Sequence, residues 1–224
     1  MNPVLPREAL EAAFRNPDQF TKKRFRATND VRLLEVGSYR FILKEFTGFA
    51  SLAWVYYAMR GYIPSAQSAS SRCSQERIKL TIAQQKELNL TPRIYDVRDL
   101  AIAEEYIEGE SARYSPSREI CIEALGDLRK LHNADILHGD PHIKNYIVGN
   151  GKNVWVDFEC DTSRPGYHKD RDLVCLLRSI RNCAPYCPLP ALSDFVNAYS
   201  PSYENSAANS IANLARKVVL PELF

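Results

Sequence analysis

Short runs that mix β-branched, aromatic and aliphatic residues with polar neighbours dominate the first half of the chain. This pattern is typical of half-buried β-strands. The five predicted strands are residues 24–27, 31–36, 39–46, 94–97 and 100–107. Gly37-Ser38 supplies a tight turn between the second and third strands, and a short helix is predicted over residues 6–20. The pattern therefore predicts a small five-stranded antiparallel sheet.

Helical periodicity appears between the third and fourth predicted strands. Ile78 and Ile82 lie four positions apart in a pattern that begins at Ser74. The pattern stops near Asn89, because the residue before a proline is biased away from helix and Pro92 follows. We therefore expect one helix beside the sheet.

Two further stretches lie between the third strand and this helix. Residues 48–59 form an apolar and aromatic run that fits one face of a helix. Core packing and contact of Trp54 or Tyr57 with a lipid interface are both compatible with this composition. Residues 63–72, rich in Ser and Ala, are expected to form a flexible connection.

The second half of the chain is mainly helical in pattern. Ser115 followed by Pro116 suits an N-cap and first turn, and a buried face then continues to His132. Another apolar helix is expected to begin at Asp172. Two further helical segments are residues 191–199 and 203–219. The order of elements predicts an α+β fold with a sheet-containing lobe followed by a helical lobe.

A phosphoryl-transfer site is indicated by the stretch ILHGDPHIKNYIVGNGKNVWVDFEC, residues 136–160. Asp140 is followed five positions later by Asn145, and Asn150-Gly151 predicts a tight hairpin that returns Asp157 to the side of Asn145. Transfer of the γ-phosphate of ATP depends mainly on positioning and on neutralising charge. Asp140 suits the group that orients an acceptor hydroxyl and receives its proton, while Asn145 and Asp157 offer hard oxygen ligands for Mg²⁺.

Two charged residues of the predicted first lobe complement this site. Lys44, late in the third strand, suits a point charge for the α- and β-phosphates, although lysines at strand ends are also common on surfaces. Glu76 lies in the first turn of the predicted helix, and the hypothesis is that it pairs with Lys44; a solvated helix-terminal charge is the alternative. Exposed backbone groups of Glu105 and Ile107 are expected to bind adenine. Asp172 is expected to hydrogen-bond the backbone of the catalytic loop.

Composition limits the classes of partner. The 29 basic and 27 acidic side chains leave no global field that would favour nucleic acid. Lys22 to Arg26 form a local basic patch that suits either phosphate contact or a solvated face. The start of the chain lacks the apolar core of a signal peptide, and no stretch approaches the roughly 18 apolar residues of a membrane span, so a cytoplasmic location is expected.

The six cysteines predict no disulfide framework or zinc site. Cys183 and Cys187 form an isolated C-x-x-x-C, and neither a second pair nor a nearby histidine completes a zinc site. Reduced thiols that behave as small apolar side chains are therefore expected.

The ordered motifs resemble the lipopolysaccharide core heptose kinases, a bacterial branch of the protein-kinase-like fold. The matching pieces are FRATNDVRLLEVGSYRFILKEF, Glu76, EEYIEG, GDPHIKN, VDFE and KDRDL. The resemblance implies a two-lobed protein-kinase-like fold with an N-lobe over residues 1–104, a hinge over 105–110 and a C-lobe over 111–224. It also implies a short activation segment, ATP and Mg²⁺ as cofactors, a heptose hydroxyl of the lipopolysaccharide inner core as acceptor, and peripheral action at the cytoplasmic face of the inner membrane.

The resemblance assigns roles residue by residue. Lys44 matches the ATP lysine, Glu76 its partner, Asp140 the catalytic aspartate, and Asn145 and Asp157 the metal ligands. These five roles are what the resemblance implies and not a consequence of spacing alone.

Two departures from the pattern of protein kinases bear on the acceptor. His142, expected to belong to the catalytic residues, stands where Ser/Thr protein kinases place lysine, and Glu159 stands where they have the glycine of D-F-G. Only fourteen residues separate Asp157 from Asp172, which favours a non-peptide acceptor. Other interpretations remain open: a phosphotransferase for a small alcohol or antibiotic, a compact protein kinase, or a pseudokinase that binds nucleotide without catalysis.

Overall fold

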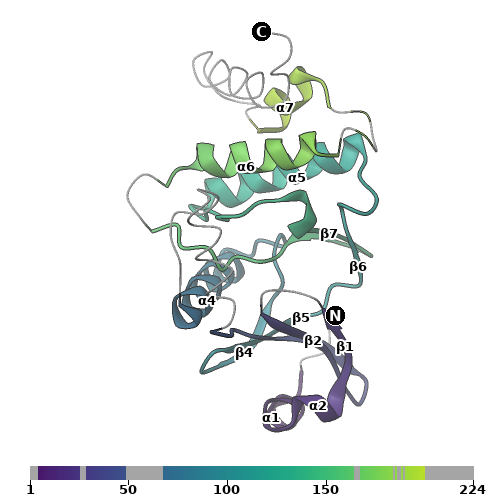
Figure 1. The fold of residues 1–224 in the computed structure, drawn as a ribbon, viewed down its shortest axis with the longest axis vertical. Coiled ribbons are helices and arrows are strands. Elements are labelled where there is room, and N and C mark those ends of the chain that lie inside the picture. The colour runs from purple at the N-terminus through teal and green to yellow at the C-terminus, as the bar shows by residue number, and fades with distance from the viewer. Residues whose placement is uncertain are drawn as a thin grey trace. The chain divides into compact units, whose positions relative to one another are not determined.

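The computed structural model, drawn in Figure 1, describes the larger part of the chain. The described residues are 5–25, 29–48, 68–163, 167–183, 185, 188 and 190–199. Internal contacts divide the chain into two units. The first comprises Met1–Thr81 and Pro92–Tyr106, and the second comprises Ile82–Thr91 and Ile107–Phe224. The stretch Ile82–Thr91, which the sequence pattern places in the first lobe, thus groups with the second unit.

The first unit is built on a five-stranded antiparallel sheet with the order β1-β2-β3-β5-β4. Its strands are β1 (Thr21–Phe25), β2 (Asp30–Val36), β3 (Tyr39–Glu45), β4 (Ile94–Arg98) and β5 (Ala101–Glu105). The turn between β2 and β3 contains Gly37 with φ +60°, a conformation that glycine adopts without steric cost. The five strands predicted from the alternating pattern are therefore present.

The helix predicted over residues 6–20 is divided into α1 (Arg7–Arg15) and α2 (Pro17–Phe20). Asn16 between them has φ −145° and ψ 71°, because a residue that precedes proline is disfavoured in the helical region. The buried side of α1 packs on the sheet. The core that they share consists of Leu10, Ala13, Leu34, Phe41, Leu43 and Ala103.

Helix α4 (Ala69–Gln85) begins before the predicted start at Ser74. Ser68 explains the earlier start, because its Oγ accepts a hydrogen bond from the backbone N–H of Ser71 at 3.1 Å and satisfies a donor of the first turn. A second apolar cluster of this unit contains Phe46, Cys73 and Ile102. The helix is therefore anchored at its beginning by both a cap and the core.

The stretch before α4 is only partly described. The predicted flexible connection over residues 63–72 is wrong for residues 69–72, which are helical. Residues 49–59 of the predicted apolar run lie outside the described residues, as do residues 63–67. The alternatives for the apolar run therefore stay predictions.

The second unit contains a three-stranded antiparallel sheet with the order β6-β7-β8. Its strands are β6 (Gly109–Ser111), β7 (Tyr146–Gly149) and β8 (Asn153–Trp155). The β7–β8 hairpin is the one that Asn150-Gly151 predicts, whereas β6 was not predicted. Gly109 pairs with Gly149, and a Cβ at Gly109 would lie 2.2 Å from the carbonyl oxygen of Val148. The absence of a side chain at Gly109 therefore permits this close pairing.

The described part of this unit also contains helices. They are α5 (Arg118–Asn133), α6 (Lys169–Arg181), α7 (Leu192–Tyr199) and a short 3₁₀ helix, η1 (Ile143–Asn145). The N-cap of α5 is Ser117, whose Oγ accepts from the N–H of Ile120 at 3.2 Å, so the predicted cap at Ser115 is wrong. Both α6 and α7 contact α5, and α6 lies beside it in Figure 1.

The predicted helix at Asp172 is present, although α6 starts at Lys169. The segment predicted over 203–219 lies outside the described residues. Within the described ranges, every helix is too short or too polar to cross a bilayer.

Candidate active site

The loop between α5 and β7, here the 138–145 loop, is fixed by a carboxylate from α6. Asp172 is completely buried, and its oxygens accept hydrogen bonds from the backbone N–H of His138 at 2.7 Å and of Gly139 at 2.9 Å. The hydroxyl oxygen of Tyr167 lies 2.7 Å from Asp172 Oδ1 and 2.8 Å from the carbonyl oxygen of Gly139. The loop contact expected of Asp172 is therefore present in the structure.

A buried histidine extends this network to α7. His132 on α5 lies with Nε2 3.1 Å from Asp172 Oδ2, and its Nδ1 contacts the hydroxyl of Tyr199. Burial opposes ionisation of Asp172, but the hydrogen bond and charge of His132, the charge of His138 and the hydrogen bond from Tyr167 together lower the pKa of its carboxyl. Asp172 is therefore an ionised acceptor at neutral pH.

Gly139 shapes the loop through its backbone. Its φ is +98°, and a Cβ at this position would lie 2.4 Å from the Cβ of Cys160. An alanine there would strain the backbone, and its Cβ would clash with the Cβ of Cys160, which is fixed close to the main chain. The sequence H-G-D thus places a required glycine immediately before the central aspartate.

Asp140 presents a carboxylate at a half-exposed position. Its Oδ1 lies 3.2 Å from His142 Nε2, and 37% and 39% of the two side chains are exposed. Burial raises the pKa of the Asp140 carboxyl, but the hydrogen bond and charge of His142 and the charges of Lys144 and His138 outweigh it, so the pKa is lowered to about 2. Asp140 is therefore ionised at neutral pH and can accept a hydrogen bond from a hydroxyl.

Asn145 ends the 3₁₀ helix beside Asp140. Its Nδ2 donates to the carbonyl oxygen of Asp140 at 3.0 Å and lies 3.5 Å from Asp140 Oδ2. With Nδ2 used in this way, Oδ1 is the atom of the amide that can serve as a ligand. Amide and carboxylate oxygens are the donors that Mg²⁺ prefers, so Asn145 fits such an ion.

The β7–β8 hairpin leads the chain back to Asn145. The N–H of Val156 donates to the carbonyl oxygen of Asn145 at 2.9 Å, and Asp157 follows directly. Asp157 adopts φ +71°, a left-handed conformation that is uncommon outside glycine. The hairpin thus returns the chain at Asp157 to the backbone of Asn145, and the role of its carboxylate as a second hard donor for Mg²⁺ stays a prediction.

The first unit contains the Lys44–Glu76 pair. Lys44 lies on β3 opposite Val31 of β2 and Ile102 of β5. Its Nζ is 2.7 Å from Glu76 Oε2, and only 4% and 2% of the two side chains are exposed. The structure thus contains the expected pair, and Glu76 is buried instead of a solvated helix charge.

The predicted adenine contacts, Glu105 and Ile107, lie at and just after the end of β5. Glu105, the last residue of β5, is 7% exposed, and its N–H donates to the carbonyl oxygen of Arg93 at 2.8 Å. The N–H of Glu105 is therefore used within the first unit, and the expected adenine contacts through backbone groups of Glu105 and Ile107 stay predictions. Ile107 is half-buried and belongs to the second unit.

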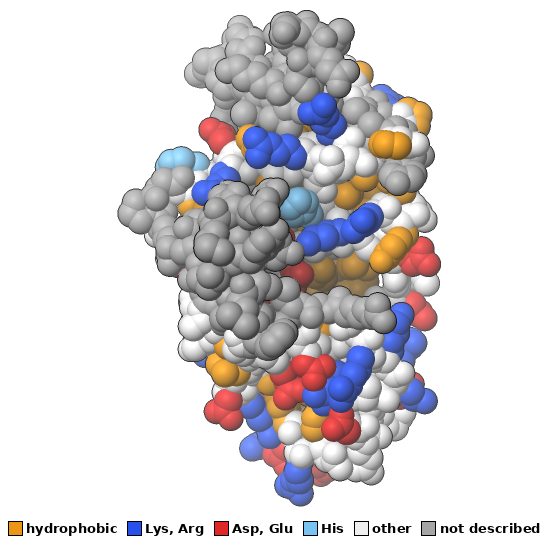
Figure 2. Space-filling model, in the orientation of Figure 1, with side chains coloured by type: hydrophobic (Ala, Val, Ile, Leu, Met, Phe, Trp, Pro, Cys, Tyr) orange, Lys and Arg blue, Asp and Glu red, His pale blue; other side chains and the backbone are white. Residues whose placement is uncertain are grey.

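The basic patch over residues 22–26 is largely balanced by acidic side chains. Lys22 Nζ lies 3.4 Å from Glu35 Oε1, and Arg24 pairs with Asp18. Arg26 lies outside the described residues. On the face drawn in Figure 2, basic and acidic side chains are intermixed over the first unit. The structure therefore gives this patch less net positive charge than the sequence suggests.

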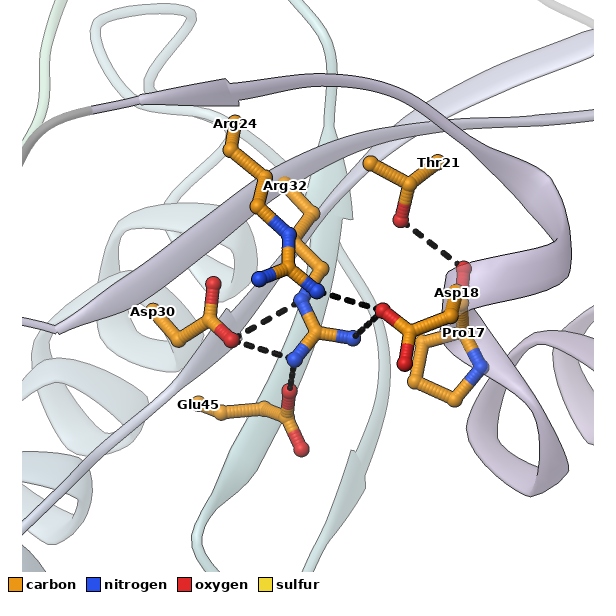
Figure 3. Close-up of polar contacts among 7 residues, drawn as sticks. All are labelled: Pro17, Asp18, Thr21, Arg24, Asp30, Arg32 and Glu45. Carbon is orange, nitrogen blue, oxygen red and sulfur yellow. Dashed lines mark hydrogen bonds and ion pairs between the residues drawn. The ribbon is translucent and has the colours of Figure 1, made fainter.

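Arg32 is the centre of this charge network and was missed by the sequence analysis. Figure 3 shows its guanidinium between the carboxylates of Asp18, Asp30 and Glu45. Glu45 Oε2 lies 2.9 Å and Asp18 Oδ1 3.3 Å from Arg32 nitrogens. Asp30, Arg32 and Glu45 also line a cavity of about 700 Å³. The contacts of Arg32 with Asp18 on α2 and with Glu45 on β3 join residues far apart in the sequence, so they appear only once the tertiary structure is known.

The second unit also contains residues that sequence reasoning did not select. Tyr167, His132 and Tyr199 support the 138–145 loop through Asp172, and Cys175 Sγ lies 3.8 Å from Asp140 Oδ1. These contacts join residues up to 67 positions apart. The only signal in the sequence is that Cys175 follows Asp172 by three positions on a predicted helix.

Comparisons with solved structures show a protein-kinase-like fold. The Mycobacterium tuberculosis PknI kinase domain matches with a TM-score of 0.52 and 15% identity, over 88% of this chain and 94% of that one. The structure of WaaP in complex with acyl carrier protein matches with a TM-score of 0.55 and 13% identity, over 92% of each chain. The predicted fold class is thereby confirmed. No protein-family model matches the chain.

Local sequence similarity connects the chain to archaeal proteins. It is 37% identical over 68 residues to a probable serine/threonine-protein kinase BUD32 homolog of Archaeoglobus fulgidus, covering 30% of this chain and 35% of that protein. It is 37% identical over 70 residues to KEOPS complex subunit Bud32 of Pyrococcus abyssi, covering 28% and 32%. A probable bifunctional tRNA threonylcarbamoyladenosine biosynthesis protein of Methanosarcina barkeri is 38% identical over 69 residues.

These matches are short. The chain spans 12% of the Methanosarcina protein and about a third of each Bud32 protein. What the comparisons establish for this chain is therefore the class of fold.

Proposed function

We propose that the protein is a phosphotransferase that uses ATP and Mg²⁺ to phosphorylate an alcohol group. The observation that carries this proposal is the ionised Asp140 carboxylate, held beside Asn145 on a loop that a buried aspartate fixes. The protein-kinase-like fold supports it, and so does the buried Lys44–Glu76 pair of the first unit.

The residues divide the work of phosphoryl transfer. Asp140 accepts a hydrogen bond from the acceptor hydroxyl and receives its proton as the new P–O bond forms. At the same time the bond between the γ-phosphorus and the β–γ bridging oxygen breaks, and ADP leaves. Lys44, held by Glu76, supplies positive charge to the α- and β-phosphates. Asn145 Oδ1 and Asp157 hold Mg²⁺, which neutralises phosphate charge when bound. His142 contacts Asp140 and orients its carboxylate.

The first candidate acceptor is a heptose hydroxyl of the lipopolysaccharide inner core. The order of the sequence motifs favours it. His142 also favours it, because it stands where Ser/Thr protein kinases place lysine. The chain between Asp157 and α6, which begins at Lys169, is short, and this supports an acceptor other than an extended peptide. With a glycolipid acceptor the protein works at the cytoplasmic face of the inner membrane as a peripheral protein.

The second candidate is a kinase related in role to the Bud32 proteins. Its support is the 37% identity over about 70 residues to a protein named as a KEOPS complex subunit. A protein acceptor, or a task in tRNA threonylcarbamoyladenosine biosynthesis within a complex, follows from this candidate. Local identity of this degree is compatible with a shared nucleotide site and a different acceptor.

Mass spectrometry of the acceptor distinguishes the candidates. Deacylated lipopolysaccharide that lacks core phosphate is incubated with the protein and Mg-ATP, beside Asp140→Asn and the surface control Asp135→Asn. A phosphate on heptose that requires Asp140 but not Asp135 supports the first candidate. ATP turnover that depends on Asp140 without sugar phosphate directs the search to protein acceptors. No Asp140-dependent turnover with any acceptor, and no Mg-ATP stabilisation, contradicts the proposed function.

A further inference from the structure

Three potential metal ligands meet at the tip of the 138–145 loop. Asp140 Oδ1 lies 3.2 Å from His142 Nε2 and 3.8 Å from Cys175 Sγ. All three atoms lie within 4.8 Å of one another. Bond lengths of about 2.0–2.3 Å around tetrahedral Zn²⁺ place its ligand atoms about 3.3–3.6 Å apart. Small side-chain movements are therefore enough to enclose a zinc ion.

The donor set selects the metal. A thiolate, an imidazole and one carboxylate oxygen suit zinc, which accepts nitrogen and sulfur ligands in tetrahedral geometry. Mg²⁺ prefers oxygen ligands in octahedral geometry and keeps its waters, so it fits Asn145 and Asp157 better than this cluster. The two kinds of ion are thus directed to different side chains.

Helix α6 fixes the geometry of the cluster. Asp172 and Cys175 are three positions apart on this helix and therefore lie on the same face. Asp172 binds the loop backbone at His138 and Gly139, and Cys175 reaches Asp140 from the next turn. One helix thus both fixes the loop backbone before Asp140 and presents the thiol of Cys175 to the Asp140 carboxylate.

The cluster is accessible to an ion. Asp140 and His142 have 37% and 39% of their side chains exposed, and Cys175 is half-buried. A catalytic type of zinc site uses three protein ligands and keeps a fourth position for water. Zinc binding replaces the thiol proton of Cys175, which leaves to solvent.

We propose that Asp140, His142 and Cys175 form a zinc site that inhibits the protein when it is occupied. Zinc at this position takes the Asp140 oxygen that would accept the hydrogen bond of the acceptor hydroxyl. The binding site stands on its geometry alone, whereas the inhibitory effect rests on the proposed phosphotransferase function. Zinc and acceptor therefore compete for one carboxylate.

Zinc titration with a competing chromophoric chelator tests the site. Wild type is compared with Cys175→Ser and His142→Ala, and with Cys183→Ser as the matched control. The Cys183 thiol donates to the Ser179 carbonyl oxygen, a bond that serine can also make, and it is not part of the cluster. We expect one zinc ion on wild type and on Cys183→Ser, and at least about tenfold weaker binding in both cluster variants. Equal zinc affinity in all four proteins overturns the site.

Folding and magnesium serve as controls for this titration. Thermal unfolding shows whether each variant is folded, and His142→Ala carries the test alone if Cys175→Ser is not. Millimolar Mg²⁺ is expected to leave zinc binding unchanged. Displacement of zinc by Mg²⁺ contradicts the assignment, because the donor set would then be of the hard oxygen type.

Phosphotransfer at buffered free zinc tests the inhibition. Each protein is compared with its own zinc-free rate, and a chelator is added at the end to restore that rate. We expect the zinc concentration for half-inhibition to rise at least about tenfold in Cys175→Ser, as expected for loss of a metal ligand. Zinc binding without any phosphotransfer activity leaves the site intact and rejects the proposed function. Activity that zinc inhibits equally in Cys175→Ser rejects the inhibitory site.

Discussion

The ammonium nitrogen of Lys44 lies 2.7 Å from Glu76 Oε2 inside the first unit, with only 4% and 2% of the two side chains exposed. Replacing both members of such a pair by apolar residues is often neutral or stabilising, whereas removing one member costs about 3–5 kcal/mol. Stability alone therefore gives little reason for this pair. A role of Lys44 in binding a phosphate accounts for it better.

Variants of this pair separate stability from binding. Glu76→Gln is expected to lower the free energy of unfolding by about 3–5 kcal/mol, because Lys44 keeps a buried charge without its carboxylate. The double variant Lys44→Met/Glu76→Leu is expected to recover most of this loss but to show no thermal stabilisation by Mg-ATP. Urea unfolding and thermal shifts measure the two effects. A double variant that Mg-ATP still stabilises would show that Lys44 does not bind the nucleotide.

Asp172 is expected to make the protein sensitive to acid. The pKa of its carboxyl is lowered in the folded state, so its stabilising contribution is complete above the ordinary value of about 3.9. That contribution disappears as the pH falls through the folded-state pKa. Asp172→Asn should lower stability at pH 7 by about 1–3 kcal/mol for each loop N–H left unsatisfied. It should also flatten the decline below pH 4, measured by urea unfolding at each pH.

Asp140 predicts the shape of the pH–rate profile. With a pKa of about 2, its carboxylate stays ionised from pH 4 to 8, so its protonation gives no acidic decline near pH 5. His142→Ala removes the hydrogen bond and charge that lower this pKa. The fall in turnover on the acidic side should then occur at a higher pH than in wild type. Turnover at saturating Mg-ATP from pH 4 to 8 measures both profiles. Identical acidic limbs in the two proteins would contradict the coupling of Asp140 to His142.

Gly139→Ala should destabilise the protein more than Gly151→Ala, although both glycines have a positive φ. A Cβ at Gly139 would lie 2.4 Å from Cys160 Cβ, whereas Gly151, also at positive φ, has no atom within 4 Å of its Cβ position. Both substitutions strain the backbone, but only Gly139→Ala adds overpacking, worth about 1–3 kcal/mol. Denaturant unfolding of both variants measures the difference. Equal destabilisation would mean that strain alone matters at Gly139.

The sequence predicts best those features that depend on neighbouring residues. Alternation identifies the five strands, and Asn150-Gly151 identifies the hairpin that returns the chain to Asn145. The contact between Lys44 and Glu76 is also predictable, although 32 positions separate them, because their order relative to the loop motif restricts the choices. Local pattern and motif order together therefore define the fold class and the central residues.

Features that depend on tertiary contacts escape such prediction. Ser115 and Ser117 flank the same proline, and both can cap a helix; the structure uses Ser117 because its Oγ reaches Ile120. Strand β6 has the weak strand sequence Gly-Glu-Ser and exists because it pairs with β7. The approach of Cys175 to Asp140 requires the packing of α6 under the loop, which no local pattern encodes.

Trp155 on β8 is completely buried beside the loop, with its ring 5.2 Å from that of His138 in an edge-on arrangement. Among the described residues its indole N–H has no hydrogen-bond acceptor, an environment that shifts tryptophan emission to the blue. The chain contains one other tryptophan, Trp54. A Trp54→Phe variant would therefore have a single tryptophan, next to His138, whose backbone N–H donates to Asp172. Its intensity and wavelength would report movements of the loop in real time, without any attached dye.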